Sequence, residues 1–115
     1  MTIKEIAEEY NKTVDKDELL IEPITIQTAE AFEKLLKDNK MHGYSIVPSY
    51  LGEIYFEWDT KKPTSLGVCI NAEEYAILEH LDHRIPGDFY IEAFNTRNEE
   101  EIDELISILL ELTND

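Results

Sequence analysis

The segment Gly52-Glu53-Ile54-Tyr55-Phe56-Glu57-Trp58-Asp59 decides the fold, because apolar and polar side chains alternate along it. A β-strand points successive side chains to opposite faces of its sheet. The set predicted to face a core is Ile54, Phe56 and Trp58. The set predicted to face solvent is Glu53, Tyr55 and Glu57, a mixed aromatic and acidic surface.

Further short segments have strand character, at residues 44–47, 66–71, 75–77 and 89–94. Pro48 ends the first of them, and residues 60–64 between the second and third read as a turn. Residues 80–87 are predicted to be a loop that ends at Pro86 and Gly87. Short strands joined by turns predict an antiparallel β-meander of three to five strands.

The stretch from Pro48 to Tyr75 resembles a hairpin of small bacterial proteins, in the motif Gly52-x-Ile54-x-Phe56-Glu57-Trp58 followed by Leu66-x-Val68-x-Ile70. In those proteins a helix precedes a Pro-rich turn, a glycine and an alternating strand that ends in Glu-Trp. The resemblance covers under a third of the chain and implies a hairpin here. It implies no activity and no functional residue.

Helical periodicity flanks the strands on both sides. Thr2 and Glu5 have capping-box spacing before a helix predicted to run from residue 3 to residue 11 or 13. A second helix is predicted to begin at the N-cap Thr28 and to stop before Gly43. The last helix, residues 99–112, has either Thr96 or Asn98 as its cap. These elements predict one α+β domain over residues 1–115, with the C-terminal helix packed on the sheet.

The apolar arc of the last helix is wide, since Ile108 and Leu110 fall outside the main stripe. A helix of this kind covers a sheet and touches a second surface as well. That surface is either the second helix or another copy of the chain. The second alternative predicts a homodimer through the C-terminal helix.

Acidic residues dominate the composition: 26 Asp and Glu stand against 10 Lys and Arg in 115 residues, for a net charge of −16. Residues 64–115 contribute −11 of this charge, from thirteen acids and two arginines. Such a chain repels DNA, RNA and anionic lipid, so we expect no direct nucleic-acid or membrane binding. We expect a basic protein as partner: a nuclease, a toxin or a nucleic-acid-binding protein.

Carboxylates are also the candidate binding residues. The outer face of the central hairpin contributes Glu53, Tyr55 and Glu57. A second group is predicted to build a negative wall that imitates the phosphates of DNA, and its members are Glu73, Glu74, Glu79, Glu92, Glu100, Asp103 and Glu104. Dispersed, solvated acids that only keep the protein soluble are the alternative interpretation.

Catalytic patterns are weak. Cys69 lies between apolar neighbours on a predicted strand, which is typical of a small buried residue. His80 and His83 could share a divalent ion on a helix, but their segment precedes Ile-Pro-Gly and is predicted to be non-helical. The four glycines are isolated, so no phosphate-binding loop is expected. We therefore predict no enzyme activity, no metal and no cofactor.

Together these features predict a cytoplasmic, non-catalytic protein that neutralises a basic partner. Neither an apolar start nor an apolar run of the ~18 residues of a membrane span is present in the sequence. An antitoxin, an immunity protein or a phage-encoded inhibitor of a nuclease or defence protein would act in this way. Two alternatives stay open: a homo-oligomeric structural or regulatory protein, and a small metal-dependent enzyme that uses His80 and His83.

Overall fold

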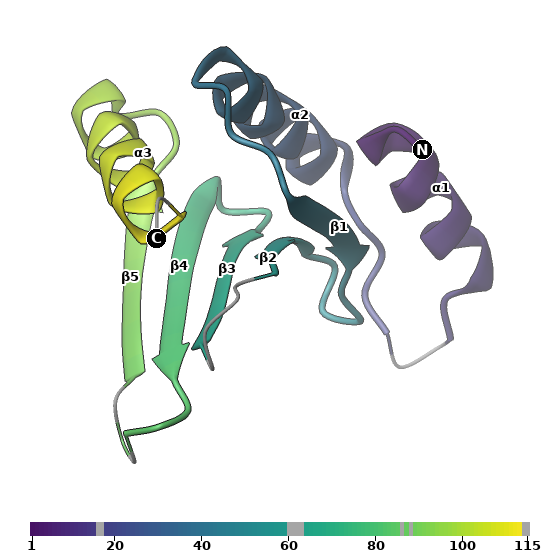
Figure 1. Ribbon diagram of the computed structural model, residues 1–115. Helices are drawn as coiled ribbons and strands as arrows, with labels where there is room; N and C mark the ends of the chain where they lie inside the picture. The colour runs from purple at the N-terminus through teal and green to yellow at the C-terminus, as the bar shows by residue number, and fades with distance from the viewer. Residues whose placement is uncertain (16–17, 60–63, 86, 88, 114–115) are drawn as a thin grey trace.

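A computed structural model describes residues 1–15, 18–59, 64–85, 87 and 89–113. Within them the chain forms α1 (Ile3–Thr13), α2 (Pro23–Asp38), β1 (Tyr44–Pro48), β2 (Ile54–Trp58), β3 (Thr64–Ile70), β4 (Tyr75–Asp82), β5 (Phe89–Asn95) and α3 (Glu99–Thr113). The predicted α+β fold is confirmed, with two N-terminal helices, an antiparallel sheet and a C-terminal helix packed on it (Figure 1).

The sheet is a meander in which the five strands lie in chain order from β1 to β5. Each strand is antiparallel to the one before it, and the predicted alternation sets the faces. Phe56, Val68 and Leu78 are cross-strand partners, and all three are fully buried. The confirmed apolar face therefore lies under the helices, with the Phe32 ring of α2 edge-on to Phe56 at 5.1 Å between centroids.

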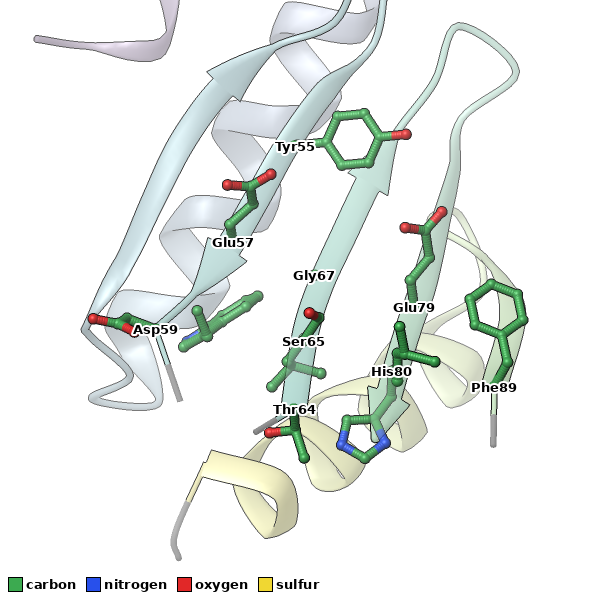
Figure 2. Close-up of a pocket in the computed structure, with 12 residues that line it drawn as sticks. Tyr55, Glu57, Asp59, Thr64, Ser65, Gly67, Glu79, His80 and Phe89 are labelled. Carbon is green, nitrogen blue, oxygen red and sulfur yellow. The ribbon is translucent and has the colours of Figure 1, made fainter. Parts of the chain in front are cut away.

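The opposite face of the sheet has no helix on it in the described part of the chain. Figure 2 looks onto this open face and shows α2 and α3 behind the strands. The open face is where the outward side chains of β2, such as Tyr55, lie. The central strand therefore separates a dry core from a surface that a partner can reach.

The second helix begins six residues earlier than predicted, because its N-cap is Glu22 and not Thr28, and Pro23 is its first residue. Proline has a φ suited to the first turn of a helix and needs no N–H partner there. Glu22 is the N-cap and makes no side-chain capping bond. The Thr28 hydroxyl instead donates to the Ile24 carbonyl at 2.8 Å, within the helix.

The predicted loop at residues 80–87 is wrong at its start, because β4 continues through Asp82. Leu81 has cross-strand partners on both sides, Ser65 of β3 and Phe89 of β5. This two-sided pairing satisfies the backbone where the sequence pattern alone is weak.

Asn98 and not Thr96 caps the last helix. The Asn98 side-chain oxygen accepts from the backbone N–H of Glu100 and Glu101, at 3.0 and 3.3 Å. The Thr96 hydroxyl donates elsewhere, to the Glu74 carbonyl at 2.6 Å.

The apolar arc of α3 is mostly covered within the chain. Its main stripe is buried, and the flanking side chains pack against the same core; these residues are Ile102, Leu105, Ile106 and Leu109, then Ile108, Leu110 and Leu112. Ile108, Leu110 and Leu112 stay partly exposed, and a homodimer through this helix stays a prediction. No helix among the described residues is both long and apolar enough to span a bilayer.

Candidate functional site

A hollow of about 460 Å³ opens on the helix-free face of the sheet. Gly67 of β3 forms part of its floor, and Glu57 and Glu79 are the cross-strand partners of Gly67 on β2 and β4. Figure 2 shows the two carboxylates rising on either side of the glycine. The strand register therefore places Glu57 and Glu79 on the two strands next to Gly67, which itself has no side chain.

Aromatic and hydroxyl side chains complete the hollow. Tyr55 lies at one end and Phe89 at the outer side, next to Glu79 (Figure 2). Ser65 lies on the floor, and its hydroxyl is 2.7 Å from the Nε2 atom of His83. Carboxylates beside aromatic rings are a combination that attracts cations, through charge and through the ring faces.

The hollow exists because position 67 is a glycine. A Cβ atom there would approach one backbone atom, the Phe56 carbonyl oxygen at 3.3 Å. Gly67 does not have a positive φ, so its backbone conformation does not require a glycine. Glycine within a strand often marks a place where another group approaches closely.

Negative charge and burial act together on the open face. Burial raises the pKa of the Glu79 carboxyl, and the charge of Glu53 raises it further. Burial also raises the pKa of the Cys69 thiol, with a further contribution from Glu53. Cys69 is 2% exposed, so its thiol stays protonated and covered near neutral pH, as the sequence predicted for a small buried residue.

Four predicted binding residues gather on this face. Tyr55, Glu57 and Glu79 line the hollow, and Glu53 lies close enough to interact electrostatically with Tyr55, Cys69 and Glu79. The pKa of the Tyr55 hydroxyl is raised, first by burial and then by these neighbours. The structure therefore brings together the outer-face residues of the central hairpin and one member of the second acidic group.

The other predicted acids lie elsewhere. Glu92 is the cross-strand partner of buried Leu78, so it is on the helix-covered face, where its carboxylate accepts from the Tyr90 hydroxyl. Glu74 in the β3–β4 turn pairs with Arg97. The rest are exposed, in the same turn and on α3: Glu73, Glu100, Asp103 and Glu104. The register thus puts Glu79 and Glu92 on opposite faces of the sheet.

The two candidate metal ligands diverge. His80 is in register with Leu66 and Tyr90, while His83 lies beyond the strand and contacts Ser65. Asp82 pairs with Arg84 at 2.7 Å, and this pairing lowers the pKa of the Asp82 carboxyl to about 2. Across the described ranges no group of three or more His, Cys, Asp or Glu side chains is placed to hold a metal ion.

Sequence reasoning missed three contributors to the hollow: Gly67, Ser65 and Phe89. The one available clue was a glycine inside an otherwise apolar strand, with an acidic residue on each neighbouring strand. Pairing register is needed to turn that clue into a site, because a shift of one residue would move Gly67 to the other face.

Comparison of the chain with protein-family models, with curated proteins and with solved structures finds no match.

Proposed function

We propose that this protein is a non-catalytic binding protein that neutralises a basic protein partner, with cationic side chains of the partner seated in the hollow above Gly67. The observation that carries the proposal is the pair Glu57 and Glu79, held on either side of Gly67 by the strand register. An arginine or lysine side chain entering from solvent would meet a carboxylate on each flank.

The physical case rests on charge and on aromatic contact. An arginine between two carboxylates makes charge-assisted hydrogen bonds, which are stronger than neutral ones. Tyr55 at one end of the hollow and Phe89 at its outer side offer ring faces to separate cationic groups of a partner, and Phe89 is 58% exposed. Burial and then the charge of Glu53 raise the pKa of Glu79, and a bound cation would offset the second of these effects. The net charge of −16 steers basic partners toward the molecule.

An antitoxin, an immunity protein or a phage-encoded inhibitor of a nuclease or defence protein acts by covering a basic surface, and this proposal belongs to that class. Binding of a cationic side chain in the hollow agrees better with the positions of the carboxylates than DNA mimicry does. A continuous row of charges would need Glu79 and Glu92 on one face, and they lie on opposite faces of the sheet. DNA mimicry remains a prediction, and competition between duplex DNA and this protein for a nuclease would test it.

The test uses an arginine-rich peptide and a panel of basic proteins, with affinity measured by calorimetry at low and at moderate salt. The double variant Glu57→Gln/Glu79→Gln removes two charges from the hollow. The matched control, Glu8→Gln/Glu111→Gln, removes two exposed charges from α1 and α3. We expect the hollow variant to weaken binding by about tenfold or more and the control to weaken it by about twofold.

Equal losses in the two variants would show that net charge and not the hollow governs binding. No measurable affinity of the unaltered protein for any basic probe at moderate salt would refute the proposed function. Falling association rates with rising salt are expected in either variant, because steering depends on the whole charge.

A further inference from the structure

The two edges of the sheet are unequal. β1, one edge, is five residues long and ends in Pro48. Each edge strand contacts a helix, β1 with α1 and β5 with α3. β5, the other edge, is seven residues long and has neither lysine nor proline. Natural proteins protect edge strands with such charges, with prolines or with covering elements. Helix contact does not distinguish the two edges, but β5 is longer and lacks the proline that ends β1, so β5 is the less protected edge.

Hydrogen bonds at the strand ends show which backbone groups of β5 are free. Thr96 N–H donates to the Glu74 carbonyl at 3.0 Å, so position 96 faces β4. Because this orientation alternates along an antiparallel ladder, residues 90, 92 and 94 face β4 and residues 89, 91 and 93 face outward. Asn95 N–H agrees, since it points away from β4 and donates to the Glu101 carboxylate at 3.3 Å.

Apolar side chains accompany these outward backbone groups. Phe89 is 58% exposed and Ile91 is 51% exposed, and Ala93 is exposed as well. Their cross-strand partners on β4 are Leu81, Glu79 and Ile77, so all three lie on the open face. Within the described residues, the N–H and carbonyl groups of Phe89, Ile91 and Ala93 make no hydrogen bond on the edge side. β5 therefore offers a ready template for another strand.

We propose that two copies of this chain pair through β5, antiparallel, with the two-fold axis at Ile91. In this arrangement Ile91 faces its own counterpart and Phe89 faces Ala93 of the second copy. Large and small apolar side chains then alternate along a stripe on the open face. On the other face, Tyr90 lies opposite Glu92 of the second copy, so no two carboxylates face each other directly; the Tyr90 hydroxyl donates to Glu92 of its own copy.

This register is favoured over the two nearest registers that also keep outward groups opposite outward groups. A shift toward α3 places Glu92 opposite Glu92, and like charges directly opposite are destabilising. A shift toward the start of β5 places Tyr90 opposite Tyr90 and Phe89 opposite Ile91, so that large side chains face each other on both sides of the sheet. The sequence of β5 is thus complementary to itself about Ile91, which favours a second copy over an unrelated strand as the occupant.

Pairing of this kind joins the two sheets edge to edge and leaves both open faces on one side of the assembly. The interface is isologous, since the same strand contributes from each copy. Each copy has a net charge of −16, so repulsion between the copies opposes their association at long range. Salt screens this repulsion, and association therefore strengthens as the salt concentration rises. Binding of a basic partner strand at the same edge would show the opposite dependence on salt.

The first test combines sedimentation with cysteine cross-linking of the full chain. Three single variants, Ile91→Cys, Tyr90→Cys and Ser107→Cys, are oxidised with copper phenanthroline, and the unaltered protein is the background because Cys69 is buried. We expect a dimer that tightens with salt and a disulfide-linked dimer for Ile91→Cys. Tyr90→Cys and Ser107→Cys should stay unlinked, because their Cα atoms are beyond the ~7 Å that a disulfide can bridge.

A second variant tests the edge without an oxidant. Ile91→Lys places two lysines opposite each other at the axis, and we expect the dimer dissociation constant to rise by about tenfold or more. The matched control is Tyr75→Lys, on the open face of β4 at 41% exposure, whose cross-strand partner Asn95 lies outside the paired residues 89–93. It should leave the dimer unchanged. Both variants should keep the circular dichroism of the parent.

A monomer at all concentrations and salts would overturn the proposal, as would linking of Ser107→Cys in place of Ile91→Cys. Linking of Tyr90→Cys alone would overturn the register and the charge argument behind it. Association only with a basic strand, weakened by salt, would identify a different occupant of the edge and refute the self-pairing.

Discussion

Gly67→Val is the substitution that best separates binding from folding. Gly67 pairs with Glu57 and Glu79, and its missing side chain leaves room for the hollow. Valine would place a Cβ and two methyl groups between the two carboxylates. The structure allows this change at the backbone, since position 67 lacks a positive φ and meets only the Phe56 carbonyl oxygen at 3.3 Å.

Stability and peptide affinity are expected to change in opposite directions in this variant. Replacing a glycine within a strand reduces the entropy of the unfolded chain, and a β-branched residue suits a strand, for a gain of about 0.5–1 kcal/mol. The close approach of the new Cβ atom to the Phe56 carbonyl oxygen offsets a few tenths of a kcal/mol of this gain. We therefore expect the melting temperature to rise by about 1–5 °C. Affinity for an arginine-rich peptide should fall by about tenfold, because the methyl groups occupy the cation's place.

Two measurements check the prediction: thermal unfolding by circular dichroism and peptide affinity by calorimetry. Ser45→Val is the matched control, since Ser45 is exposed on β1 in the same cross-strand row but does not line the hollow. The control should have a similar stability and an unchanged affinity. The reasoning would be refuted by unchanged affinity in Gly67→Val, or by a loss of stability of more than about 2 kcal/mol, which would show that the strand has no room for the side chain.

Three further outcomes are expected. Phe56→Ala, in the fully buried core, should lower the free energy of unfolding by about 3–5 kcal/mol, whereas Phe89→Ala, at 58% exposure, should change it by about 0.5 kcal/mol or less in denaturant titrations. Asp82 has its pKa lowered from 3.8 to about 2, so its ion pair stabilises the fold above pH 3.8 and loses that effect as pH falls toward 2; the difference in melting temperature between the parent and Asp82→Asn should shrink over this interval, and a constant difference would contradict the assignment. The Cys69 thiol, buried and with a raised pKa, should resist a thiol reagent at pH 8 until the protein unfolds, and Tyr55→Ala should speed its labelling; rapid labelling of the native parent would show that the thiol is open.

Strand and helix positions were predictable where local chemistry is strong. The alternation around Phe56 predicted β2, and the Thr2 capping box predicted the start of α1, which the structure confirms. Prediction failed at Thr28 and at residues 80–82. At Thr28 a proline upstream had already begun the helix, and at residues 80–82 pairing with two neighbouring strands extended β4 beyond its apolar pattern.

The candidate site was predictable in part. Tyr55 and Glu57 were assigned to the outer face from alternation alone, and both line the hollow. Gly67 and Phe89 were not predicted as site residues, because each reaches the hollow through pairing with strands that are distant in the sequence. The predicted acidic wall joined Glu79 and Glu92, which the register places on opposite faces.

The chain by itself determined the class of fold, the net charge of −16 and the two faces of the central strand. These follow from local periodicity and composition, which do not depend on distant neighbours. Only the tertiary structure decided which acids meet across Gly67 and which edge of the sheet stays open. The reason is that a strand's side chains acquire neighbours through pairing register, and register is a property of the assembled sheet.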